Sequence, residues 1–152
     1  MAEAAEVSDK NGQKLISFSI AAQEYCVDVM AVREIRGWTQ ATALPSSPDH
    51  VRGVINLRGA VLPIVDLSAR LGLGTTTSSA RNVIIVVDIE GQLVGLLVDA
   101  VSEIFTVNAK DVQPTPDIGS EAVKRMVKGI LAAEGGKLMS WVELQSTLKD
   151  AA

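Results

Sequence analysis

Residues 51–67, VRGVINLRGAVLPIVDL, decide the fold of this chain. The stretch divides into two apolar halves, 51–57 and 60–67, that meet at Arg58-Gly59. Because glycine adopts the backbone angles of tight turns without strain, this pattern predicts a β-hairpin. The stretch also raises a question, because Arg52 and Arg58 interrupt residues that are otherwise almost all apolar. At the turn, the stem of Arg58 can cover apolar neighbours while its guanidinium reaches solvent.

Short strands and turns of the same kind recur along the chain, which is typical of an all-β barrel or sandwich with short helices. Further strands are expected over 14–20, 23–29, 83–89, 92–98, 127–133 and 137–142. Helical segments are expected from Asp28 through Arg33, over 67–71 after an Asp66 cap, from Ser120 through Met126, and from about Val142 or Glu143 to Leu148. Residues 72–80 and 113–120 are predicted loops.

Composition bounds the class of protein. The chain has 152 residues, 47% of them hydrophobic, which suits one domain with a sizeable core. Its net charge of -4 does not favour nucleic acid or an anionic membrane surface, because both attract basic patches. Residues 82–101 are long and apolar, but charges interrupt them and Glu90-Gly91 predicts a turn, so no membrane insertion is expected. Residues 1–12 are polar, lack the features of a signal peptide and are expected to form a disordered arm.

Few side chains in the sequence could perform catalysis or hold a cofactor. His50 is the single histidine, so a site built from several histidines is excluded, and no phosphate-binding loop is present. Cys26 lies in an apolar strand and is interpreted as a core residue. Asp66, Asp88 and Asp99 end or follow predicted strands, where cap and turn roles are favoured. We therefore expect no enzyme activity, no metal and no cofactor, and a small β-barrel enzyme that uses these aspartates is the catalytic alternative.

Taken alone, the residues leave two interpretations of Arg58 open. In the first, Arg58 is a solvated turn residue that contributes little to stability. In the second, it pairs with Glu34, which lies between Val32 and Ile35 in AVREIRG, residues 31–37. Such a carboxylate–guanidinium pair would brace two β-units beside exposed apolar residues, the usual composition of a docking surface.

Four linked motifs give the chain a resemblance to a known family. They are FSIAAQEYCVDVMAVREIRG (18–37), LPSSPDHVRGVINLRGAVLPIVDL (44–67), VGLLVDAVSEIFTV (94–107) and KGILAAEGGKLMSWVELQSTL (128–148). With them the chain resembles CheW, the coupling-protein family of bacterial chemotaxis, over about residues 14–149. No kinase core or receiver domain accompanies these motifs, so the resemblance implies the free-standing adaptor rather than the kinase CheA or the hybrid CheV.

The resemblance implies two SH3-like five-stranded β-barrels packed on a shared core. They would form a CheW-like domain over 13–149, followed by a tail over 150–152. The implied function is a non-catalytic, cytoplasmic adaptor that links the tips of methyl-accepting chemoreceptors to the regulatory domain of CheA, with further copies in array rings. It would be associated with membrane receptor arrays through its partners. A CheW-like coupling protein with a non-flagellar output, such as surface motility, biofilm or second-messenger control, is the alternative.

The resemblance also implies roles for particular residues. Glu34 and Arg58 would form a salt bridge near the receptor-binding groove, and the other receptor-binding positions would be Val32, Gly53 and Val61. Apart from the resemblance, an adaptor that holds two partners needs a separate kinase side, which we expect on the other barrel near residues 94–100. There Gly95 would let a partner approach closely or would ease a bend in the barrel wall. Glu143 stands where the family often has Asp or Asn before the last helix, so Ser140 is expected to cap that helix, with Glu143 as the third residue of a capping box.

Overall fold

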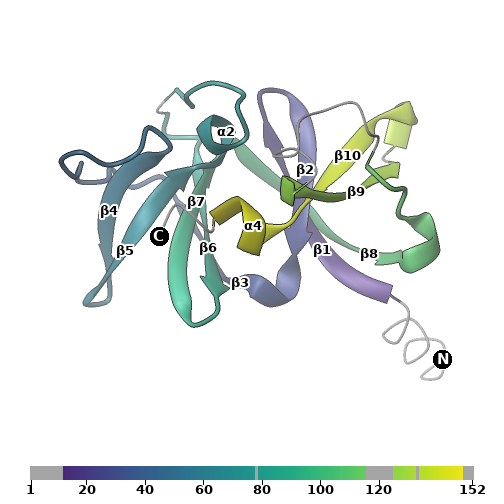
Figure 1. The fold of residues 1–152 in the computed structure, drawn as a ribbon, viewed down its shortest axis with the longest axis horizontal. Coiled ribbons are helices and arrows are strands. Elements are labelled where there is room, and N and C mark those ends of the chain that lie inside the picture. Colours follow the sequence, from purple (N-terminus) through teal and green to yellow (C-terminus); the bar gives the residue numbers. More distant parts are fainter. Residues whose placement is uncertain (1–11, 78, 116–124, 133, 149–152) are drawn as a thin grey trace.

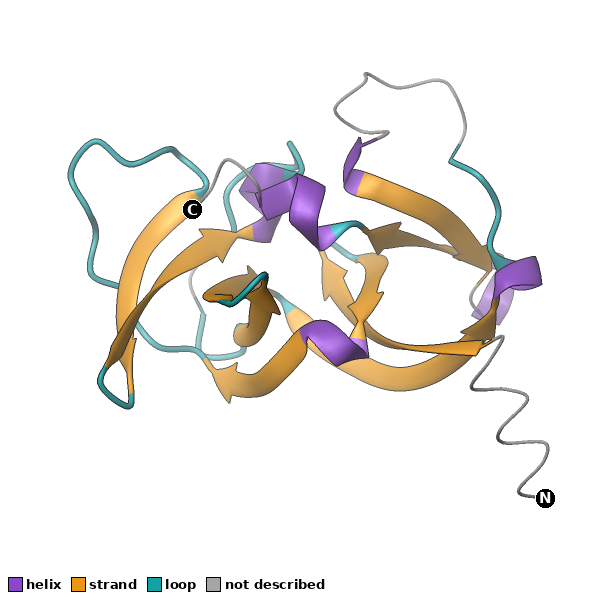
Figure 2. Cartoon of the chain, turned by 60° about the horizontal axis from the view of Figure 1, so that its bottom comes forward, coloured by secondary structure: helices purple, strands orange, loops and turns teal. Residues whose placement is uncertain are grey.

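A computed structural model describes residues 12–77, 79–115, 125–132 and 134–148 of the chain. Strands dominate the described part, and short helical segments lie between them (Figures 1 and 2). The strands are β1 (Gly12–Ile20), β2 (Gln23–Asp28), β3 (Val32–Gly37), β4 (Val51–Leu57), β5 (Ala60–Asp66), β6 (Val83–Ile89), β7 (Gln92–Val98), β8 (Ala100–Asn108), β9 (Val127–Ala132) and β10 (Leu138–Val142). The helical segments are η1 (Val29–Ala31), α2 (Leu67–Arg70), η2 (Ala109–Asp111), η3 (Glu134–Gly136) and α4 (Leu144–Leu148).

The strands form two five-stranded sheets that lie side by side (Figure 1). The first sheet has the order β8-β1-β2-β10-β9 and therefore joins the two ends of the described chain. The second sheet, β3-β6-β7-β5-β4, is built from the continuous middle of the chain. Each sheet is strongly curved, and we call them the first and second barrels. The predicted all-β fold of two five-stranded barrels is confirmed.

Three hydrophobic clusters hold this architecture together. The largest lies between the barrels and takes residues from both sheets and from α4, such as Phe18, Ile85 and Leu148, each at most 3% exposed. A second cluster fills the second barrel around Leu62 and Ile84. The third fills the first barrel and includes Cys26. Because burial of apolar surface is the main stabilising term in folding, the shared cluster makes the two barrels one packed unit.

Two tight turns join the strands of the second barrel, as the sequence predicts. At Arg58-Gly59 the φ angles are 51° and 89°, and at Glu90-Gly91 they are 52° and 88°. Two consecutive positive φ angles match the twist of a two-residue hairpin, and glycine takes such an angle without strain. A side chain completes each turn, because Asn56 Oδ1 accepts from the Gly59 amide at 3.0 Å and Asp88 Oδ1 from the Gly91 amide at 2.8 Å.

Of the three helices predicted before residue 127, one is confirmed, one is shorter than predicted and one lies largely outside the described residues. The helix after the Asp66 cap is confirmed as α2, and Asp66 accepts from the Ala69 amide at 3.4 Å. The helix expected from Asp28 through Arg33 is wrong beyond Ala31, because the chain enters β3 at Val32 and pairs with β6. The helix expected from Ser120 lies largely outside the described residues.

The start of α4 also differs from the prediction. Ser140 lies within β10 and pairs with Tyr25 and Ile130, so it cannot cap a helix. Glu143 precedes α4 directly, and its Oε1 accepts from the Gln145 amide at 3.2 Å. A glutamate therefore caps this helix in place of the shorter aspartate or serine.

Most residues at the two ends of the chain lie outside the described part, so the expected boundaries of the domain remain predictions. Residues 1–11 and 149–152 lie outside the described residues. Gly12, expected as the last residue of the arm, begins β1 and pairs with Asn108 of β8.

Candidate docking site at the turns of the second barrel

The sequence places Glu34 on β3, and the fold brings it to the β4–β5 turn. Arg58 Nη2 donates to Glu34 Oε1, so the ion pair expected between these residues is present. Arg36, two residues further along the same face of β3, donates from Nη1 to Glu34 Oε2 at 3.1 Å. One carboxylate thus lies between two guanidinium groups, a cluster that we call the Arg36–Glu34–Arg58 triad.

The two arginines of the triad differ in exposure. The side chain of Arg58 is 70% exposed, whereas those of Arg36 and Glu34 are 33% and 25% exposed. Hydrogen bonds from Arg58 and then Arg36 hold the pKa of Glu34 below its ordinary value, because both stabilise the charged form. Arg36 is not among the site residues predicted from the sequence, although the alternation of side chains along a strand places it beside Glu34.

A second ion pair fastens β3 to the other turn. Arg33 Nη2 lies 2.8 Å from Asp88 Oδ2, and Asp88 is the residue that also completes the Glu90-Gly91 turn. Both turns lie at the same end of the second barrel, at the lower left of Figure 1. Arg33 and Glu34, which are adjacent on β3, therefore bond to the β6–β7 hairpin and the β4–β5 hairpin, respectively. Strand β3 and these two hairpins form one surface.

The remaining predicted receptor positions differ in accessibility. Val61 is 67% exposed on β5, beside the Arg58-Gly59 turn. Val32 is half-buried and packs against the shared core. Gly53 is buried, with a φ of 141°, and a Cβ built on it would lie 2.1 Å from the carbonyl oxygen of Thr42. Its role in the structure is to let residue 42 cross closely over β4, where Thr42 pairs with Val54.

Gly95 cannot serve as the contact that the sequence analysis assigned to it. Its strand, β7, belongs to the same barrel as Arg58 rather than to the other one. A Cβ built on Gly95 would lie 2.5 Å from Ile64 Cδ1 and 2.9 Å from Ile84 Cγ2, inside the second barrel. The predicted kinase contact at Gly95 is therefore wrong, because a partner cannot reach the interior of a folded barrel.

Arg52, the other arginine of the opening stretch, has a structural role. Its Nε lies 3.4 Å from Asp66 Oδ2, and its Nη2 donates to the Thr76 carbonyl. Asp66 is fully buried and also accepts from the Thr76 amide at 2.8 Å and from Thr76 Oγ1 at 2.6 Å. These bonds anchor the loop after α2 to the barrel, since a buried carboxylate requires donors around it.

The other candidate chemical groups, Asp88, Asp99 and Cys26, occupy structural positions as well. Asp88 completes the turn that follows its own strand, as predicted, whereas Asp99 accepts from the Ala21 amide at 2.9 Å and so bonds to the turn between β1 and β2. Cys26 is fully buried, and burial raises the pKa of its thiol to about 12. Across the described residues, no cluster of three or more His, Cys, Asp and Glu side chains is arranged to hold a metal ion.

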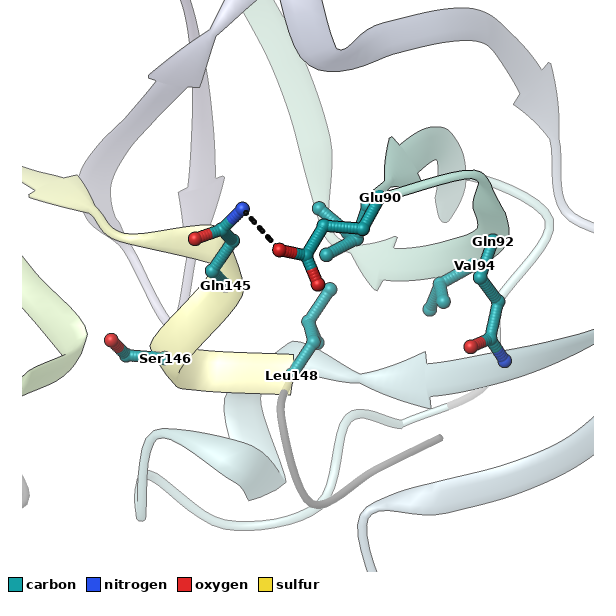
Figure 3. Close-up of a pocket in the computed structure, with 7 residues that line it drawn as sticks. Glu90, Gln92, Val94, Gln145, Ser146 and Leu148 are labelled. Carbon is teal, nitrogen blue, oxygen red and sulfur yellow. Dashed lines mark hydrogen bonds between the residues drawn. The ribbon is translucent and has the colours of Figure 1, made fainter.

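A hollow of about 410 Å³ lies beside the β6–β7 turn (Figure 3). Its walls come from both sides of the junction between the barrels: Glu90, Gln92 and Val94 from the hairpin, and Gln145, Ser146 and Leu148 from α4. Gln145 Nε2 donates to Glu90 Oε2 at 3.4 Å across this hollow. The candidate docking site therefore combines a charged triad at one turn with a hollow at the other. Within the described part of the chain, no helix has the length and apolar character needed to span a membrane.

Comparison with known proteins decides the family, because residues 14–152 match the model of the CheW-like domain. The chain belongs to the CheW-like family. It is 54% identical over 146 residues to the chemotaxis protein CheW of Rhizobium meliloti, covering 96% of this chain and 94% of that relative. It is also 31% identical to the chemotaxis protein CheW of Klebsiella aerogenes over 90% of this chain and 82% of the relative.

A solved structure supports the same assignment. The crystal structure of the scaffolding protein TtCheW from Thermoanaerobacter tengcongensis superposes with a TM-score of 0.78. The two chains are 33% identical, and the match covers 87% of this chain and 84% of that one. The family and the two-barrel fold expected from the four motifs are thereby confirmed.

Proposed function

We propose that this chain is a non-catalytic scaffold of bacterial chemotaxis that couples methyl-accepting chemoreceptors to the histidine kinase CheA. The observation that carries the proposal is similarity over nearly the full length to relatives named chemotaxis protein CheW. The chemistry of the described residues is in keeping with it, because the carboxylates that could have been catalytic are caps, turn residues or ion-pair partners. A chain of this kind acts by presenting surfaces rather than by transforming a substrate.

The receptor side of the scaffold is proposed to be the docking site at the turns of the second barrel. The exposed guanidinium of Arg58 and the exposed Val61 flank one turn, and the hollow beside Glu90 adjoins the other. Mixed apolar and charged surfaces of this kind are typical of exchanging interfaces. Val32 supports this surface from the shared core, and Gly53 supports it through the crossing of residue 42.

The kinase side is proposed to be a separate surface that binds the regulatory domain of CheA. An adaptor that holds two partners at once requires contacts that do not overlap, and each contact can be weak when many are joined in an array. Association with membrane receptor arrays then follows from these partners.

Co-purification with the receptor and the CheA of the source bacterium tests the proposal. Arg58→Glu is expected to reduce capture of the chain by receptor-containing membranes, and Arg81→Glu provides the control. Arg81 is also an exposed arginine, but it lies in the loop after α2, where its amide donates to Ser79. Failure of the wild-type chain to be captured with either partner would refute the proposed function.

A further inference from the structure

The Arg36–Glu34–Arg58 triad contains more positive charge than a brace requires. A single arginine suffices to neutralise one carboxylate, yet Glu34 accepts from two. The two guanidinium groups use different carboxylate oxygens, Oε1 for Arg58 and Oε2 for Arg36. Loss of one bond would therefore leave the other in place.

The two arginines are also unequally available to a partner. Arg58 is 70% exposed, and Glu34 is its one hydrogen-bond partner among the described residues, although a guanidinium carries five N–H donors. Arg36 is half as exposed, its Nε is buried, and it extends from the paired strand β3. Arg58 is thus the arginine that can leave, and Arg36 is the one that stays.

The turn that carries Arg58 does not depend on the ion pair. Gly59 follows Arg58 in the left-handed region, and its amide is held by Asn56 at 3.0 Å. The strands on either side are paired through Leu57 and Ala60. When the guanidinium swings away from Glu34, the backbone keeps the side chain at the exposed end of the barrel.

We propose that Arg58 leaves Glu34 to bind a carboxylate of the docking partner, while the positioning residue Arg36 keeps the charge of Glu34 compensated. The inference rests on the proposed function, in which that partner is the receptor, and it assigns an acidic side chain to the receptor at this contact. Exposed ion pairs are weak, so opening the Arg58–Glu34 pair is cheap, and a bidentate bond to a new carboxylate replaces it. Once Arg58 has left, burial of the Glu34 carboxylate in the interface without a positive partner would be costly. Arg36 removes this cost because it stays paired with Glu34.

Binding to the cytoplasmic domain of a chemoreceptor from the source bacterium, measured by calorimetry, separates exchange from bracing. Arg58→Met is expected to weaken binding about tenfold or more, because the guanidinium touches the partner. Glu34→Gln is expected to tighten binding about two- to fivefold, because Arg58 no longer has to be released. In a rigid brace, Glu34→Gln would instead weaken binding as Arg58→Met does, and that result overturns the exchange.

The role of Arg36 is tested by a double-mutant cycle. Arg36→Met is expected to weaken receptor binding about two- to fivefold, because Glu34 then depends on Arg58 alone. Adding Glu34→Gln to Arg36→Met is expected to restore binding, because the carboxylate that needed compensation is gone. If Arg36→Met acts through general damage to β3, Glu34→Gln will not restore binding, and the positioning role is wrong.

A measurement without any partner completes the test. Carbon-13 NMR of the Glu34 carboxyl group in Arg58→Met is expected to give a pKa that stays below the ordinary value, because Arg36 still donates to Oε2. A return to the ordinary value would overturn the role of Arg36. If the wild-type chain binds no receptor domain, the proposed function fails and the exchange fails with it. If the wild type binds and Glu34→Gln weakens binding, only the exchange fails.

Discussion

Substitution of Gly95 tests whether this position supports the barrel or contacts a partner. A Cβ at residue 95 would lie 2.5 Å from Ile64 Cδ1 and 2.9 Å from Ile84 Cγ2, so both isoleucines must move. Overpacking of this kind costs about 1–3 kcal/mol, which corresponds to a fall in melting temperature of roughly 2–12 °C for a chain of this size. We therefore expect Gly95→Ala to fold with clearly reduced stability.

Gly95→Asp is expected to have a far larger effect than Gly95→Ala. It adds an unpaired carboxylate to the barrel interior at a cost of several kcal/mol, which is comparable with the total stability of about 5–15 kcal/mol of a typical domain. We expect this variant not to fold, so a loss of kinase binding by Gly95→Asp would carry no information about an interface.

Thermal and urea unfolding followed by circular dichroism measure both effects, with Gly37→Ala as the matched control. Gly37 also lies on a strand of the second barrel, but a Cβ built on it has no neighbour within 4 Å. Gly37→Ala is expected to be neutral or to stabilise the protein by up to about 1 kcal/mol, because alanine loses less backbone entropy on folding. A Gly95→Ala variant as stable as the wild type, or a folded Gly95→Asp variant, would refute the placement of Gly95 inside the barrel.

Three further predictions concern buried and charged groups. Asp66→Asn should lower the free energy of unfolding by about 2–4 kcal/mol, because the two Thr76 donors lose a charged acceptor. The control Asp88→Asn should lower it by at most about 1 kcal/mol, and equal effects of the two variants in urea unfolding would contradict the buried network. Cys26 should react with a thiol reagent at pH 8 only after denaturant is added, because burial raises the pKa of its thiol to about 12. Rapid labelling of the folded protein would contradict the burial of Cys26. Because the pKa of Glu34 is lowered in the folded protein, its ion pairs stabilise the fold at pH values above its ordinary pKa of 4.5, and this contribution is lost as the pH falls through the folded-state pKa. Glu34→Gln should therefore reduce the dependence of the free energy of unfolding on pH in the acid range. An unchanged dependence would contradict the lowered pKa.

Local sequence signals were sufficient for the hairpins. Gly59 and Gly91 mark two-residue turns between apolar strands, and such turns need little tertiary context. The residues alone leave the Glu34–Arg58 pair as one of two interpretations of Arg58, and the resemblance to the CheW family favours the pair. Its geometry depends on the pairing of β3 with β6, which no local pattern specifies.

Other elements could not be predicted because tertiary contacts decide them. Strand β8 is largely exposed, and its pairing with β1 is interrupted by a bulge at Ser17, whose Oγ bonds to the backbone of Glu103. Its side chains therefore lack the alternation that identifies a half-buried strand. The Arg52–Asp66 pair joins residues 14 positions apart, and the burial of Gly95 depends on Ile64 and Ile84, which only the complete barrel packs around it.

A capture experiment without a competing ligand tests whether the turns of the second barrel bind the receptor while another surface binds the kinase. Wild-type chain and Arg58→Glu are each incubated with the regulatory domain of CheA and, separately, with receptor-containing membranes. We expect Arg58→Glu to retain nearly full binding to the kinase domain and to bind the receptor at least about tenfold more weakly than the wild type. Equal loss of both partners by a folded Arg58→Glu variant, or undiminished receptor binding, would contradict the assignment of the receptor to the turns of the second barrel.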